Sequence, residues 1–125
     1  MEMFAKRESF VDTLFHVAIS KDVSTAIELY YDLKNNHPNQ YIFKQRELTT
    51  VAFELVQNEQ LKDAIEILKL GITIYPESAS AYQALGMGYQ LDGQKELAVQ
   101  NFERVLELEP NNNHAKEMLN RLMNE

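Results

Sequence analysis

The chain carries few side chains that could act as nucleophiles or bind a metal, and these stand apart from one another. It has five serines, three histidines and no cysteine. No serine is followed by lysine three residues later, and none lies in the G-x-S-x-G turn of serine hydrolases. His16, His37 and His114 are widely separated, and none has a second histidine four residues on, the spacing of helical zinc ligands. We therefore predict no catalytic residues, no metal site, no cofactor and no enzymatic activity.

The glycines around Met87 do not form a phosphate-binding loop, because no strand pattern precedes them. The 12 basic residues are scattered among 19 acidic ones, for a net charge of -7. A nucleic-acid partner is not expected, since its phosphates require clustered lysine and arginine. No membrane span is expected either, because no apolar run reaches the roughly 18 residues that one needs. Residues 1–8 also lack the basic-then-apolar order of a signal peptide.

The three prolines indicate where the predicted helices end. Pro76 and Pro110 are 34 residues apart, and each follows a long amphipathic stretch, as Pro38 does. Proline cannot continue a helix, and a fixed period of this length is typical of helical repeats. Residues 45–78 match residues 79–112 in size and polarity. The paired positions are Leu48 with Tyr82, Val51 with Leu85, Ala52 with Gly86, Leu55 with Tyr89, Ala64 with Ala98, Leu68 with Phe102, and Pro76 with Pro110.

Each of these segments divides into two amphipathic helices, which predicts an all-α fold without a β-sheet. The expected helices are residues 8–20, 23–36, 44–57, 61–74, 78–91, 95–108 and 112–124. Glycine inside a helix costs about 1 kcal/mol relative to alanine, so Gly71, Gly86 and Gly88 predict close helix packing. The core stripe expected for residues 95–108 consists of Leu97, Ala98, Phe102, Val105 and Leu106.

The spacing in the second segment resembles the tetratricopeptide repeat (TPR). The matching residues are Tyr82-x2-Leu85-Gly86-x2-Tyr89, then Ala98-x3-Phe102, then Pro110. The resemblance implies a right-handed superhelix of about three antiparallel helix pairs with a C-terminal capping helix. It divides a single domain, 1–125, into a degenerate repeat (7–38), a second repeat (45–78), the best-matching repeat (79–112) and the cap (112–124). About four additional residues, 39–42, separate the first two repeats.

The resemblance also implies which side chains line the concave face. These candidate partner-binding residues are Phe15, Arg46, Thr49, Phe53, Val56, Ser80, Gln83, Met87 and Gln90, with Val11 and Ala18 as further positions. Chaperone-binding members of the family hold a C-terminal carboxylate with lysine and asparagine, and Thr49, Phe53 and Ala84 stand in those places here. A peptide carboxylate is therefore a poor candidate ligand. The alternative interpretation is that Phe15, Phe53 and Met87 simply pack between neighbouring repeats.

A narrower resemblance covers roughly residues 13–123 and concerns the helical tail of bacterial serine hydrolases of the β-lactamase-like and esterase kinds. Its residues include the segments 26–34, 41–48 and 64–70 and the run Tyr75-Pro76-Glu77-Ser78-Ala79. We predict a non-catalytic protein-interaction module that binds a peptide or helix in its groove. Two alternatives are an accessory tail packed on a hydrolase domain and a module that binds a second copy of itself. The compartment would be cytoplasmic by default, or periplasmic if the chain is part of an exported hydrolase.

Overall fold

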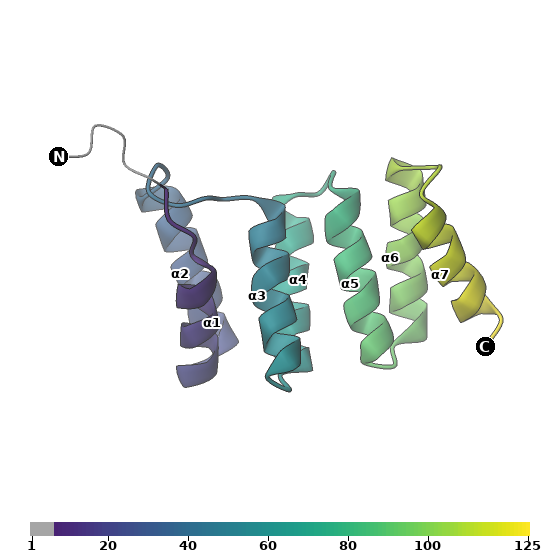
Figure 1. Cartoon of the computed structure of the whole chain (residues 1–125), viewed down its shortest axis with the longest axis horizontal. Helices are drawn as coiled ribbons and strands as arrows, with labels where there is room; N and C mark the ends of the chain where they lie inside the picture. The colour runs from purple at the N-terminus through teal and green to yellow at the C-terminus, as the bar shows by residue number, and fades with distance from the viewer. Residues whose placement is uncertain (1–6) are drawn as a thin grey trace.

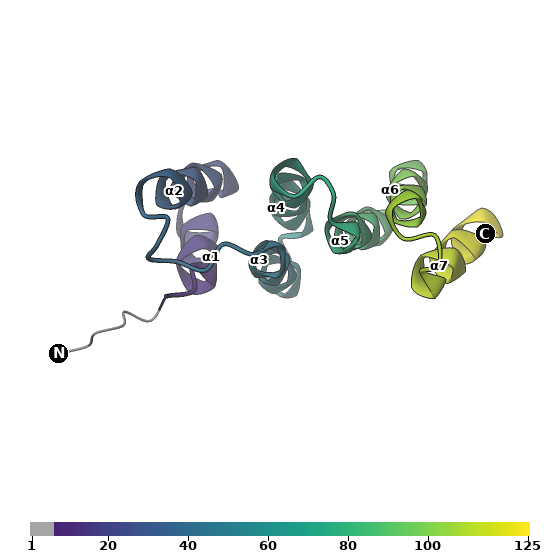
Figure 2. The same cartoon turned by 90° about the horizontal axis from the view of Figure 1, so that it is seen from above.

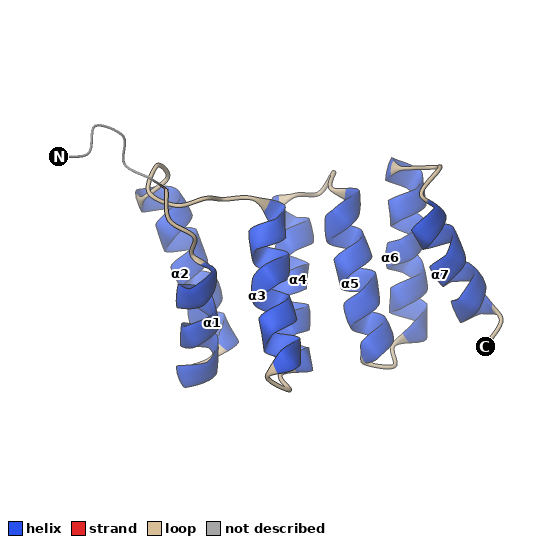
Figure 3. Cartoon of the chain, viewed as in Figure 1, coloured by secondary structure: helices blue, strands red, loops and turns tan. Residues whose placement is uncertain are grey.

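The computed structural model describes residues 7–125. These residues form seven α-helices joined by loops and contain no β-strand (Figure 3). Residues 1–6, on which the prediction about a signal peptide depends, lie outside the described residues. The helices are α1 (Val11–Ser20), α2 (Val23–Asn36), α3 (Gln45–Gln57), α4 (Leu61–Ile74), α5 (Ala79–Leu91), α6 (Lys95–Leu108) and α7 (Asn113–Met123). None of these seven helices has the length and apolar character needed to cross a membrane.

The helices stand side by side in chain order and form an elongated stack (Figure 1). Seen from above, α2, α4 and α6 form one layer, and α1, α3 and α5 form the other, with α7 at the C-terminal end (Figure 2). Each of α1, α3 and α5 packs against the helix that follows it. In addition, α1 contacts α3 and α3 contacts α5, so the first helices of successive pairs are neighbours.

Side-chain caps begin three of the helices, and prolines follow the ends of three. The Asp22, Ser78 and Asn112 side chains each accept a hydrogen bond from a backbone N–H three residues on, at the start of α2, α5 and α7. Such N-caps supply partners for N–H groups that the helix itself cannot satisfy. As predicted, α2, α4 and α6 each end two residues before a proline.

The first helix starts later than predicted, at Val11 rather than residue 8. Glu8 instead pairs in parallel with Tyr41, through hydrogen bonds from the Glu8 N–H to the Gln40 carbonyl (2.8 Å) and from the Ile42 N–H to the Glu8 carbonyl (2.9 Å). The additional residues 39–42 thus provide the backbone partner that holds residue 8 extended. This single bridge lies outside any strand, and the fold is all-α as predicted.

The core shows the close helix packing that was predicted at Gly86 and Gly88. Ala98 and Phe102 are completely buried, and a Cβ added at Gly86 would lie 3.1 Å from two carbon atoms of the Phe102 ring. The prediction was wrong for Gly71, because a Cβ there would meet no atom within 4 Å. It was also wrong for Leu97, which is 36% exposed and lies outside the core of α6.

An aromatic cluster joins α2 to the segments that precede α1 and α3. The Phe10 and Tyr30 rings meet edge to face with centroids 5.3 Å apart, and Phe43 lies 5.7 Å from Phe10. The Tyr30 and Tyr75 hydroxyls are buried without a hydrogen-bond partner. Burial raises the pKa of the Tyr30 hydroxyl above its ordinary value, and the neighbouring Tyr75 adds to this effect. Tyr30 therefore acts as a neutral core residue that ties α2 to the segment before α3.

Candidate partner-binding groove

A hollow of about 170 Å³ lies between α3 and α5, with one further lining residue, Leu68, from α4. Its lining is almost entirely hydrocarbon, and Thr49 is the one lining residue with a polar side chain. The lining residues are Thr49, Ala52, Phe53, Val56, Leu68, Ala84, Met87, Gly88 and Leu91. We call this the α3/α5 hollow.

Three large apolar side chains at the α3/α5 hollow remain in contact with solvent. Phe53 is 60% exposed, Met87 is 45% exposed and Leu91 is 65% exposed. Side chains that packed between neighbouring repeats would be expected to be less exposed than Phe53 and Met87 are. Scattered exposed apolar residues are ordinary, but several around one hollow are typical of a surface that binds another molecule.

The core residues of α3 and α5 hold this hollow in place. Val51 and Leu55 are completely buried, so α3 must direct Phe53 and Val56 toward other faces of the helix. On α5, a Cβ added at Gly88 would lie 3.0 Å from the Leu68 Cδ1. The absence of a side chain at Gly88 therefore lets α5 approach α4 closely and leaves Leu68 at the floor of the hollow.

The structure brings together four of the residues predicted to line the groove. Thr49, Phe53, Val56 and Met87 all line the α3/α5 hollow. Four other candidates, Arg46, Ser80, Gln83 and Gln90, do not line it. Arg46 is exposed, with its Nε 3.8 Å from the Glu47 Oε1. Leu91 was not among the predicted site residues, although it follows Met87 by four positions and so lies on the same helix face.

The remaining candidate, Phe15, lines a second hollow, which lies between α1 and α3. This hollow is more open, with a volume of about 330 Å³, and its other lining residues are Glu54, Gln57 and Asn58. We call it the α1/α3 hollow. It is polar on its α3 side and aromatic on its α1 side, so the two hollows beside α3 differ in chemistry.

Neither hollow has the composition of a metal or catalytic centre. Within residues 7–125, no three His, Asp or Glu side chains come together in a way that could hold a metal ion. The α3/α5 hollow presents no ionisable group at all. This lining can bury the apolar side chains of another molecule. Such burial stabilises a complex by about 25 cal/mol per Å² of apolar surface removed from water.

Comparisons with known proteins agree with this architecture. Residues 79–112 match the family model of the tetratricopeptide repeat. The fold resembles the first TPR of Spaghetti (RPAP3) bound to an HSP90 peptide, with a TM-score of 0.62 and 22% identity over 92% of this chain and 88% of that one. It also resembles the Sgt2 TPR domain from Aspergillus fumigatus, with a TM-score of 0.61 and 21% identity over 99% of this chain and 83% of that one.

A third similar structure is that of MamA, with a TM-score of 0.59 and 23% identity over 87% of this chain and 61% of that one. No curated protein matches the chain in sequence. The described helices thus have the all-α fold of TPR domains, which confirms the predicted fold class.

Proposed function

We propose that this chain is a non-catalytic protein-interaction module whose α3/α5 hollow receives an apolar segment of a partner protein. The observation that carries the proposal is the exposure of Phe53, Met87 and Leu91 around a hollow lined by hydrocarbon. Large, adaptable apolar side chains at the centre of a patch are typical of binding hot spots, and methionine fits varied partners.

A TPR domain of similar fold was solved with a peptide of sequence SRMEEVD, which supports a binding role for this architecture. That peptide is acidic, however, and no lysine or arginine lines the α3/α5 hollow. Thr49, Phe53 and Ala84 stand at the positions where the family resemblance places carboxylate-binding residues. With a net charge of -7 on the chain, we expect a partner segment with an apolar face rather than an acidic chain terminus.

Two other roles use the same surface and remain alternatives. A second copy of the chain could fill the hollow, or the module could be the accessory tail of a hydrolase. The similar structures described above offer no support for the hydrolase tail. Light scattering separates self-association from binding to a different protein. A longer reading frame with a serine nucleophile motif would favour the tail.

The proposal is tested by affinity capture from the source organism with three immobilised proteins. These are the wild-type chain, the double variant Phe53→Ser/Met87→Ser and the control Met123→Ser. Met123 is a suitable control because it is 59% exposed yet lies on α7, away from the hollow. We expect the wild type and the control to retain the same specific protein and the double variant to lose it. Equal capture by all three proteins would contradict the proposal.

A further inference from the structure

The two hollows beside α3 occupy equivalent places in successive repeats. Residues 45–78 correspond to residues 79–112 with an offset of 34, so Glu54 corresponds to Gly88 and Gln57 to Leu91. Gly88 and Leu91 line the α3/α5 hollow, whereas Glu54 and Gln57 line the α1/α3 hollow. Equivalent positions therefore carry a glycine and a leucine in the α3/α5 hollow and a carboxylate and an amide in the α1/α3 hollow.

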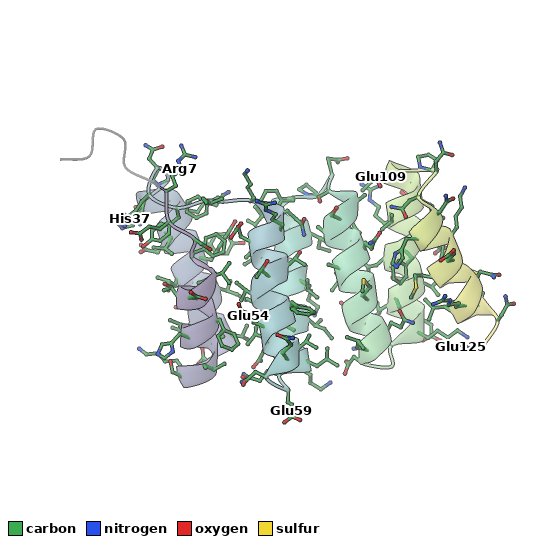
Figure 4. All side chains as sticks on the ribbon, in the orientation of Figure 1. Arg7, His37, Glu54, Glu59, Glu109 and Glu125 are labelled. Atoms are coloured by element: carbon green, nitrogen blue, oxygen red, sulfur yellow. The ribbon has the colours of Figure 1, made fainter. Side chains whose placement is uncertain are left out.

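The side chains of the α1/α3 hollow offer acceptors and an aromatic ring. Glu54 is half-buried and lies on the side of α3 that faces α1 (Figure 4). The Asn58 Nδ2 donates a hydrogen bond to the Gln60 Oε1. The Asn58 Oδ1 can therefore accept a hydrogen bond from a ligand. Phe15 is half-buried on the opposite wall. A carboxylate, an amide oxygen and a ring together fit a hydrogen-bonding cation.

No cation of the described chain fills this role. The four ion pairs among residues 7–125 involve Glu47, Asp92, Glu66 and Glu107, and none involves Glu54. Elsewhere the fold does place cations over aromatic rings. The Lys34 Nζ lies 5.5 Å from the centre of the Phe43 ring, and the Arg104 Cζ lies 5.5 Å from the centre of the Tyr82 ring. The α1/α3 hollow has an aromatic ring and a carboxylate, but no cation among residues 7–125 lies over the Phe15 ring or pairs with Glu54.

We propose that the α1/α3 hollow binds a lysine or arginine side chain of the partner, next to the apolar residue held in the α3/α5 hollow. This inference rests on the proposed function and specifies its ligand. Neighbouring helix axes lie about 8–10 Å apart, so the two hollows should be separated by about this distance. A partner spans it with roughly three residues of an extended segment or six residues of a helix. The partner motif is therefore an apolar anchor followed or preceded at that spacing by a basic residue.

The test uses the isotopically labelled full chain and NMR titration with Nα-acetyl-arginine amide. Nα-acetyl-citrulline amide is the matched control ligand, because it has nearly the same shape but no charge. We expect saturable shifts at Phe15, Glu54, Gln57 and Asn58 with the arginine probe and none with citrulline. Glu54→Gln should weaken arginine binding about three- to fivefold, the effect of losing a partly exposed ion pair. Glu117→Gln, which removes an exposed carboxylate of α7, should leave it unchanged.

Three results would overturn the inference: equal shifts with both probes, shifts spread over the acidic surface, or no effect of Glu54→Gln. A parallel titration with Nα-acetyl-leucine amide tests the proposed function independently of the basic-residue site. Leucine shifts at Phe53, Met87 and Leu91 without arginine shifts at Glu54 would reject the basic-residue site and leave the apolar hollow intact. Arginine shifts without any leucine shifts would instead count against the proposed function, on which this inference rests.

Discussion

Glu59 and Gly93 occupy the same position in the turns of successive helix pairs, with φ angles of 62° and 75°. Both turns close in the same way. The Gln60 N–H donates to the Leu55 carbonyl at 2.8 Å, and the Gln94 N–H donates to the Tyr89 carbonyl at 2.9 Å. In this pattern the helix ends at a residue in the left-handed conformation. Glycine adopts this conformation without strain, whereas it is unfavourable for a residue with a Cβ.

We therefore expect Glu59→Gly to stabilise the protein. Relief of the left-handed strain is offset in part by the extra freedom of glycine in the unfolded chain, which leaves a gain of about 0.5–1 kcal/mol. Urea unfolding followed by circular dichroism measures this difference. The reciprocal variant Gly93→Glu should lose about 1 kcal/mol. A destabilised Glu59→Gly variant would show that the carboxylate contributes more than the strain costs.

Gly71→Ala should also stabilise the protein. Gly71 lies inside α4, and a Cβ at this position would meet no atom within 4 Å. Alanine is the better helix former by about 1 kcal/mol, so the melting temperature should rise. Gly86→Ala is the matched control, because its Cβ would lie 3.1 Å from the Phe102 ring and force the ring to move. If Gly71→Ala melted below wild type, the packing around α4 would be tighter than described.

Core substitutions in α6 should show the opposite behaviour. Phe102→Ala leaves a cavity beneath Gly86 and should cost about 3–5 kcal/mol. Ala98→Leu places three additional carbon atoms at a completely buried position and should cost about 1–3 kcal/mol. Thermal unfolding of both variants checks the register of the helix pair. Melting temperatures within a degree of wild type would be incompatible with that register.

Local patterns were sufficient to predict most of the fold. The bounds of α2, α4 and α6 agree with the predictions, because a proline follows the end of each of these helices by two residues. The start of α1 could not be predicted in the same way. Glu8 is extended because it pairs with Tyr41, and a contact between residues 33 positions apart leaves no periodic signal.

The candidate site was predictable only in part. The family resemblance placed Phe53 and Met87 on the concave face, and the structure places both at the α3/α5 hollow. Leu91 was not among the predicted groove residues. It is the last residue of α5, and the sequence does not indicate whether a leucine next to a turn is exposed. The division into an apolar α3/α5 hollow and a more polar α1/α3 hollow depends on how α1, α3 and α5 stand beside one another, which repeat spacing alone does not specify.

In the proposed function, Phe53 and Met87 contact a partner and are not part of the core. The most direct measurement is a titration of the captured partner, or of the chain with itself, using the wild type and Phe53→Ser/Met87→Ser, with unfolding curves for the same samples. We predict that association is lost while the free energy of unfolding falls by no more than about 1 kcal/mol, as is usual for exposed positions. A loss of several kcal/mol of stability with unchanged association would contradict this account and make both residues part of the core.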